Sequence, residues 1–279
     1  MLKTNSQIAQ GKESVVESAK RMGLKLDISL ATAEALALPN SAWQTHFNSG
    51  YHNGGWQAIA LRESTESPLD IAPGDHAIET YHNNSTWSAC PALAQLVEQF
   101  QCPIKSVRLM RLASGGIIRE HVDVGISLEH GEVRLHIVLQ SDEQTHFYVS
   151  QKRVPMRLGE CWYIDVSQPH RVLNTGSKER IHLVIDCLVN PWLVDAVKSS
   201  DHGDPYPDHD DFQAAFQCFR ETVFVNKDLQ KRLLIPADRM GFIAESIAAG
   251  EELGFFFTDA EVLSAMNAGR RAWIEQWIL

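Results

Sequence analysis

Apolar and polar residues alternate through the middle of the chain, between residues 103 and 190. The segments SVRLMRL, EVRLHIVLQ, THFYVSQKRV, CWYIDV and RIHLVIDCLV follow one another with glycine and other turn residues between them. Side chains of a strand point alternately to its two faces. Short strands that recur about every ten residues indicate a sandwich or barrel of strands rather than βαβ units.

Helical spacing of apolar residues flanks this region. Residues 5–38 and 90–100 are predicted to be helical, and residues 56–62 form an early strand. Residues 199–210 are polar, acidic and proline-containing, which is typical of a linker. Beyond the linker, apolar residues again recur at helical spacing. We therefore expect a mainly β fold with flanking helices, divided into a domain over 1–198, a linker over 199–210 and a small α-helical domain over 211–279.

Composition narrows the classes of function. The chain has 279 residues, 44% of them hydrophobic, and a formal net charge of -10. Such an acidic chain has no broad electrostatic reason to bind nucleic acid or an anionic membrane. No apolar run reaches the roughly 18 residues that span a bilayer, and the polar N-terminus lacks a signal-peptide core. The five cysteines form no C-x-x-C pair, so we expect reduced thiols and a cytoplasmic location.

A candidate metal site lies in the β-rich region. His121 and Asp123 form an H-x-D pair, and positions i and i+2 of a strand share one face. His170, which follows Pro169 at the start of a predicted strand, is the candidate third ligand. Two histidines and one carboxylate leave open positions on the metal, as in non-haem Fe(II) oxygenases. Residues 201–211 are richer in histidine and aspartate, but without strand spacing we interpret them as a solvated linker.

A buried cation adds to this constellation. Arg180 begins the otherwise apolar segment RIHLVIDC. A guanidinium binds a carboxylate through two parallel hydrogen bonds, so Arg180 is a candidate for the distal carboxylate of 2-oxoglutarate, whose 2-oxo acid end the iron would chelate. Arg134 and His136 share one face of their strand and are candidates for the same pocket.

Residues 103–190 resemble the aspartyl/asparaginyl β-hydroxylase family of Fe(II)/2-oxoglutarate-dependent dioxygenases. The matching segments are REHVD, RLHIVL, GECWYIDVSQPHRV and RIHLVID, in that order. The resemblance implies a double-stranded β-helix, which is a cupin-like jelly roll. It also implies that His121, Asp123 and His170 bind Fe(II), and that 2-oxoglutarate and O₂ are cosubstrates. Arg180 would bind 2-oxoglutarate, with Arg134 and His136 lining its pocket.

The leading hypothesis is therefore hydroxylation of an amino acid, a peptide or protein side chain, or a related small molecule, with succinate and CO₂ as coproducts. The alternative is a cupin-like metal-binding protein that does not oxidise, such as an isomerase or a ligand sensor. That alternative does not require a cation at Arg180, which is the feature that separates the two hypotheses.

Other positions stay open at this stage. Arg108 and Arg111 lie on opposite faces of one strand, so only one can face the pocket. Trp56 and Arg62 are candidates for substrate contact.

Residues 212–266 resemble the small helical Nif11 / nitrile-hydratase-like leader family. Two roles are open for this segment: it caps the barrel or forms a homodimer, which we favour, or it recruits a peptide or protein substrate.

Overall fold

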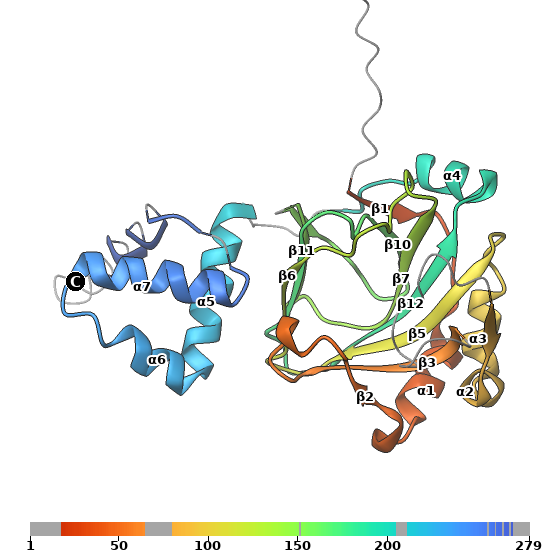
Figure 1. Cartoon of the computed structure of the whole chain (residues 1–279), viewed down its shortest axis with the longest axis horizontal. Coiled ribbons are helices and arrows are strands. Elements are labelled where there is room, and N and C mark those ends of the chain that lie inside the picture. The colour runs from red at the N-terminus through yellow and green to blue at the C-terminus, as the bar shows by residue number, and fades with distance from the viewer. Residues whose placement is uncertain are drawn as a thin grey trace, which may run out of the picture.

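Two antiparallel sheets packed face to face form the body of the protein (Figure 1). The computed structural model describes residues 18–64, 80–150, 152–204, 211–255, 257–259, 261–263, 265–267 and 269. The larger sheet has the order β1-β10-β7-β12-β5-β3-β2, with β4 paired to β3. Its strands are β1 (Ala19–Met22), β2 (Gln44–Thr45), β3 (Trp56–Ser64), β4 (Tyr81–Asn83), β5 (Ile104–Leu112), β7 (Glu132–Gln140), β10 (Cys161–Ile164) and β12 (Arg180–Leu188).

The smaller sheet has the order β6-β11-β8-β9. Its strands are β6 (Ile117–His121), β8 (Thr145–Val149), β9 (Lys152–Val154) and β11 (His170–Asn174). With the larger sheet it makes the jelly roll that the spacing of short strands and the family resemblance predicted.

Successive side chains of each strand in the larger sheet point to opposite faces, so they pack into two separate cores. On β5, Met110 and Leu112 point between the sheets, where they pack with Trp162 and Val172. The intervening residues of the same strand, such as Leu109, belong to a second core on the outer face of the larger sheet. This division follows from the period of two in a strand.

Four helices cover the outer face of the larger sheet. They are α1 (Ser29–Ala37), α2 (Ser85–Ala89), α3 (Pro91–Val97) and α4 (Pro191–Lys198). Buried residues of α1, α3 and α4, among them Ala35, Leu93 and Val197, pack into the outer core. Two polar contacts fix α3: its amides at Ala92 and Leu93 donate to the carboxylate of Glu34 on α1 at 3.0 and 2.9 Å.

The prediction of one helix over residues 5–38 is wrong for its described part. Residues 19–22 form strand β1, which pairs with β10, and Met22 is buried against the outer core. Only residues 29–37 are α-helical, as α1. Local spacing favoured a helix, but the open edge of β10 supplied hydrogen-bond partners, so tertiary pairing decided the conformation. Residues 5–17 lie outside the described residues.

Three further helices pack against the smaller sheet from outside (Figure 1). They are α5 (Asp211–Val225), α6 (Lys227–Leu233) and α7 (Arg239–Glu252). Phe219 and Phe255 from this helical segment share a core with Tyr148 of β8 and Leu173 of β11. The predicted linker is described only to residue 204, so the domain boundaries stay a prediction. Among the described helices, none is both long and apolar enough to cross a bilayer.

The turn after α7 brings the helical segment against β6. Gly254 has φ +80°, and a Cβ there would lie 3.0 Å from the backbone nitrogen of Glu120 and 3.3 Å from Cα of Arg119. Gly131 has a similar φ of +84°, but a Cβ there would meet nothing within 4 Å. The two glycines therefore share the backbone conformation and differ in the steric contact.

We expect Gly254→Ala to destabilise the protein more than Gly131→Ala. Each variant places an L side chain in the left-handed region, at a cost of about 1–2 kcal/mol, and only Gly254→Ala adds a clash with β6. Urea unfolding of both full-length variants measures the difference. Equal losses would contradict the described contact between the helical segment and β6.

Candidate functional site

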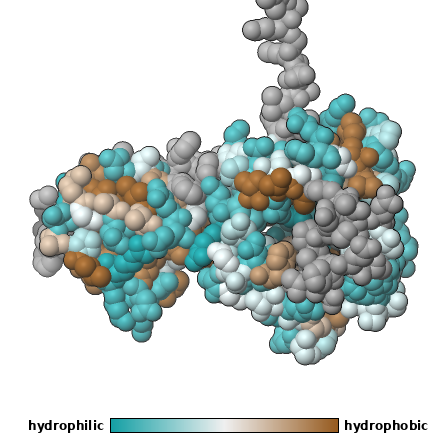
Figure 2. Space-filling view, in the orientation of Figure 1, coloured by the Kyte–Doolittle hydropathy of each residue, from teal (hydrophilic) through white to brown (hydrophobic). Residues whose placement is uncertain are grey.

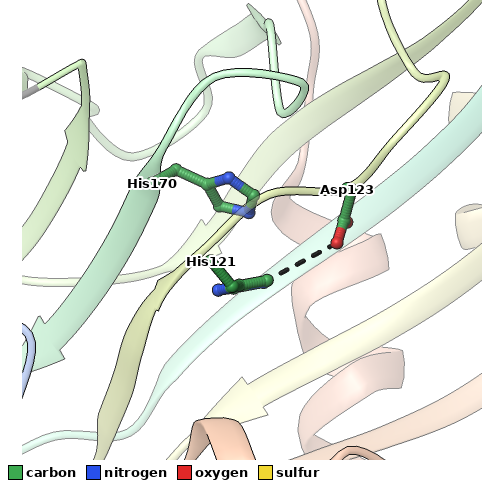
Figure 3. Close-up of side chains that lie close together, drawn as sticks. All are labelled: His121, Asp123 and His170. Carbon is green, nitrogen blue, oxygen red and sulfur yellow. Dashed lines mark ion pairs between the residues drawn. The ribbon is translucent and has the colours of Figure 1, made fainter.

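Two strands of the smaller sheet bring the predicted metal ligands together. His121 ends β6 and His170 begins β11, and the two are antiparallel partners. Asp123 lies just past β6, where its backbone N–H donates to the carbonyl of Val166 at 2.9 Å. One donor atom from each of His121, Asp123 and His170 lies within 4.8 Å of the other two. Figure 3 shows the three side chains converging.

A backbone carbonyl orients each imidazole. Nδ1 of His121 contacts the carbonyl oxygen of Arg119 at 2.8 Å, and Nδ1 of His170 contacts that of Gln168 at 3.0 Å. A carbonyl only accepts, so each Nδ1 carries the proton and each Nε2 keeps a lone pair. Contacts of this kind fix the tautomer and the ring orientation of metal-binding histidines. Nε2 is therefore the atom of each ring available to a metal.

Burial keeps both histidines neutral. It lowers the pKa of His170 to about 4, with a further contribution from the neighbouring His121. Burial also lowers the pKa of His121, against the opposing effect of Asp123. Both rings are thus uncharged at neutral pH, which is the state that ligates metals.

Asp123 stays ionised because of its neighbours. Burial by itself raises the pKa of Asp123, but the positive charge of Arg134 and the hydrogen bond that it donates outweigh this effect, so the pKa lies below its usual value. Oδ2 accepts a hydrogen bond from Nη1 of Arg134. Oδ1 faces Nε2 of His121 at 3.8 Å, the contact drawn in Figure 3. One carboxylate oxygen is thus held by Arg134 and the other is directed at the histidines.

The donor set fits iron. Two neutral imidazole nitrogens and one carboxylate are the ligands of non-haem Fe(II) oxygenases, which keep other positions of the metal open. Within the described part of the chain, no second group of three such side chains lies this close together. His202 and Asp204 of the polar stretch belong to no such group, and His209 and Asp210 lie outside the described residues.

Two cavities lie beside the candidate ligands, and each has two buried arginines in its wall. Both are lined by Trp56, Met110, His121, Asp123 and Arg134. The first also contains His136, Phe147, His170 and Arg180. The second also contains His46, Phe47, Tyr51 and Arg108.

Arg180 faces the first cavity without an acidic partner among the described residues. Its Nη2 contacts Nδ1 of His182 at 3.1 Å, and its Nε and Nη1 have no hydrogen-bond partner. The residue is 2% exposed. Burial lowers its pKa to about 9, so it is still mostly protonated at neutral pH. An uncompensated buried cation is costly, and a bound anion would remove that cost.

The other predicted pocket residues lie at the same site. Nε and Nη2 of Arg134 contact Asp186, and its Nη1 contacts Asp123. His136 lies next to His182, with their Nδ1 atoms 3.4 Å apart, and its Nε2 has no hydrogen-bond partner in the described structure. Both residues line the first cavity. Their role in binding a cosubstrate stays a prediction.

The structure also decides positions that the sequence left open. Arg108 points between the sheets and lines the second cavity, whereas Arg111 points outward, where it packs on the Trp43 ring. Trp56 lines both cavities. Arg62 lines neither cavity and contacts the carbonyl of Ile104 and the side chain of Asn83.

Sequence reasoning missed Asp186. It lies six residues after Arg180 on the same face of β12 and contacts both Arg134 and Arg108. The rule that placed Arg134 and His136 on one face of their strand also places Asp186 on the same face as Arg180. A carboxylate on a mostly apolar strand is as unusual as the arginine, and this signal could have identified it.

A comparison with known families gives an independent assignment. Residues 28–190 match the family described as Aspartyl/Asparaginyl beta-hydroxylase, over more than half of the chain. The chain belongs to this family. The family resemblance of the β-rich region is thereby confirmed, whereas the resemblance of the helical segment to Nif11-type leaders stays a prediction.

This β-hydroxylase family member also has individual relatives. L-proline cis-4-hydroxylase of Rhizobium meliloti (strain 1021) is 30% identical over 148 residues, which is 50% of this chain and 51% of that protein. The chain thus spans about half the length of this curated relative.

Two solved structures are similar at lower identity. A prolyl hydroxylase of Trichoplax adhaerens, in complex with a hypoxia inducible factor peptide fragment, has a TM-score of 0.40 and 13% identity, over 61% of this chain and 83% of that one. A 2OG-Fe(II) oxygenase of Burkholderia pseudomallei has a TM-score of 0.39 and 15% identity, over 57% and 78%.

We expect the metal-free β-hydroxylase family protein to lose stability as the pH falls from about 6.5 to about 4. In this window the unfolded chain takes up a proton at His170 that the folded chain does not, because burial lowers the folded pKa to about 4. The loss from this residue amounts to at most roughly 3 kcal/mol. Urea unfolding in a chelator at several pH values measures it.

His170→Gln removes this titrating ring and should make the pH dependence shallower, while other buried histidines such as His46 keep their contribution. His130→Gln, which changes an exposed histidine, should leave it as in the wild type. Parallel curves for the wild type and His170→Gln would show that His170 is not a buried neutral ring.

Proposed function

We propose that this protein is an Fe(II)/2-oxoglutarate-dependent dioxygenase that hydroxylates an amino acid, a peptide or protein side chain, or a related small molecule. The observation that carries the proposal is Arg180, a buried cation without an acidic partner among the described residues, which faces the cavity beside the three candidate metal ligands. Family membership over residues 28–190 supports it.

Each group has a defined role. His121, Asp123 and His170 would hold Fe(II) through one Nε2 each from the histidines and one oxygen of Asp123. The iron, when bound, supplies the activation of O₂. One oxygen atom ends in the hydroxyl group of the product and the other in succinate, while the 2-oxo acid carboxyl group leaves as CO₂.

Arg180 would bind the distal carboxylate of 2-oxoglutarate. Its Nε and Nη1 are two donors of one guanidinium and match the two oxygens of a carboxylate. Nε2 of His136, in the wall of the same cavity, is a further group that could contact the cosubstrate. The apolar side chains of Phe147 and Val172 line the remaining wall and would exclude water from the reacting centre.

The second cavity is the proposed substrate site. Tyr51 stacks on His121 with ring centroids 4.7 Å apart, and Trp56 stacks on His46 at 3.4 Å. The cavity thus combines aromatic walls with the buried cation of Arg108, which suits a substrate that carries an anionic group. The likeness to an L-proline hydroxylase supports an amino acid or one of its derivatives.

The location and assembly of the protein are also proposals. Four cysteines are free thiols, which is consistent with a reducing, cytoplasmic compartment: Cys90, Cys102, Cys161 and Cys187. The helical segment exposes large apolar side chains, namely Phe224, Val225, Leu234, Ile235 and Met240. Figure 2 shows apolar surface over this segment. We propose a homodimer formed through it, with recruitment of a peptide or protein substrate as the other role.

We expect Arg180→Ala to weaken 2-oxoglutarate binding at least 100-fold, because it removes one partner of a buried charge pair, a loss of about 3 kcal/mol or more. An anaerobic titration of the Fe(II)-loaded protein, followed by the visible absorption band of the iron–2-oxo acid chelate, measures it. His170→Ala should abolish the band. Arg111→Ala, which changes an arginine of β5 that points away from both cavities, should leave it unchanged.

A second ligand isolates the role of the cation. 2-Oxobutyrate has the chelating end of 2-oxoglutarate but no distal carboxylate, so Arg180→Ala should not change its weak binding. Equal losses for both ligands would place Arg180 elsewhere in the mechanism. A folded, iron-loaded wild type that gives no band with 2-oxoglutarate would leave a non-oxidative cupin-like protein as the better account.

A further inference from the structure

Asp186 lies at the centre of a buried network of charges. It is 1% exposed and sits on the inner face of β12, where its register partners are Ser106 on β5 and Arg134 on β7. Its Oδ1 accepts from Nε of Arg134 at 2.7 Å, and its Oδ2 accepts from Nη2 of Arg134 at 3.1 Å. Oδ2 also accepts from Ser106 at 2.9 Å and from Nη2 of Arg108.

This carboxylate lies between two cations that repel each other, and it contacts both. Arg108 and Arg134 are both buried, at 1% and 6% exposure. Burial alone would raise the pKa of Asp186, but the two guanidiniums outweigh it and hold that pKa well below the usual range. Asp186 is therefore ionised at neutral pH, and both arginines have a charged partner.

The network continues to the candidate metal ligand. Because Nε and Nη2 of Arg134 are bound to Asp186, its Nη1 is directed at Oδ2 of Asp123. Asp123 lies past the end of β6, so no strand pairing fixes its side chain, and it is 27% exposed. The two histidines, by contrast, lie in paired strands. Among the three ligands, Asp123 thus depends most on a side-chain contact for its orientation.

We propose that Asp186 is a positioning residue for the metal site. It acts through Arg134 and holds the carboxylate of Asp123 with one oxygen toward the histidines. By anchoring Arg108 as well, it fixes the cation of the second cavity. This inference rests on the proposed function, because it takes His121, Asp123 and His170 as the metal ligands.

The test measures metal affinity without cosubstrate, substrate or turnover. Co(II) serves as the probe, and its visible absorption is followed in the metal-stripped full-length protein. Asp186→Asn keeps the shape of the side chain and removes its charge, so it should weaken Co(II) binding about 10- to 100-fold, as expected for a residue that orients a ligand. Near-UV circular dichroism checks that the variant is folded.

A double-mutant cycle separates positioning from a general effect on the fold. In an Asp123→Ala background, Asp186→Asn should change Co(II) affinity no further, because the ligand through which it acts is gone. Glu132→Gln is the matched control, because it breaks another buried ion pair in the same sheet, between Glu132 of β7 and Lys105 of β5 at 2.5 Å. It should leave Co(II) affinity as in the wild type. An undiminished effect of Asp186→Asn in the Asp123→Ala background, or an equal effect of Glu132→Gln, would overturn the proposal.

Arg134→Lys provides the test if Asp186→Asn does not fold. Lysine keeps the charge but has one nitrogen, which cannot contact Asp186 twice and Asp123 once. Arg134→Lys should weaken Co(II) binding to a similar degree, and wild-type affinity would overturn the proposal.

His170→Ala serves as the reference for the site itself. If it leaves Co(II) affinity unchanged, the proposed metal site is wrong. If it abolishes binding while Asp186→Asn has no effect, only the positioning role is wrong.

Discussion

The need to neutralise positive charge between two apolar sheets shapes the interior of this protein. Two guanidiniums, those of Arg108 and Arg134, are buried beside each other, and Asp186 contacts both. A buried charge is tolerated when it is paired and hydrogen-bonded. Arg180 differs, because among the described residues it has no acidic partner. Two of these three buried cations thus contact a carboxylate and the third, Arg180, contacts none, and this difference marks where an anion is expected.

The helical segment is connected physically to the strand that carries His121. Its aromatic core includes Tyr148 and Leu173 from the smaller sheet, and Gly254 lies against the backbone of β6 at Arg119 and Glu120. The carbonyl of Arg119 is also the group that orients the imidazole of His121. The segment therefore supports the strand that carries His121 from outside.

Much of the β-rich region could be predicted from the sequence. Segments such as RIHLVIDC have the length and the residue pattern of a strand, and this pattern is visible without knowledge of the partner strands. The N-terminal prediction failed for the opposite reason. Residues 19–22 carry no strand pattern of their own and became β1 because the edge of β10 offered pairing partners. Strand β10 lies more than 130 residues further along the chain, so the residues around β1 give no sign of this pairing.

For the candidate site, the sequence by itself determined which residues are the candidates: the H-x-D pair, the later His170 and the cation at Arg180 all stand out by spacing and residue type. Only the tertiary structure decided how they meet. The pairing of His121 with His170 requires β6 and β11 to be neighbours, and the choice between Arg108 and Arg111 depends on which face of β5 lies inside. The roles of Asp186 and of the second cavity depend on contacts among β5, β7, β12 and the loop at Tyr51. Such contacts join residues far apart in the chain, and only folding sets their distances.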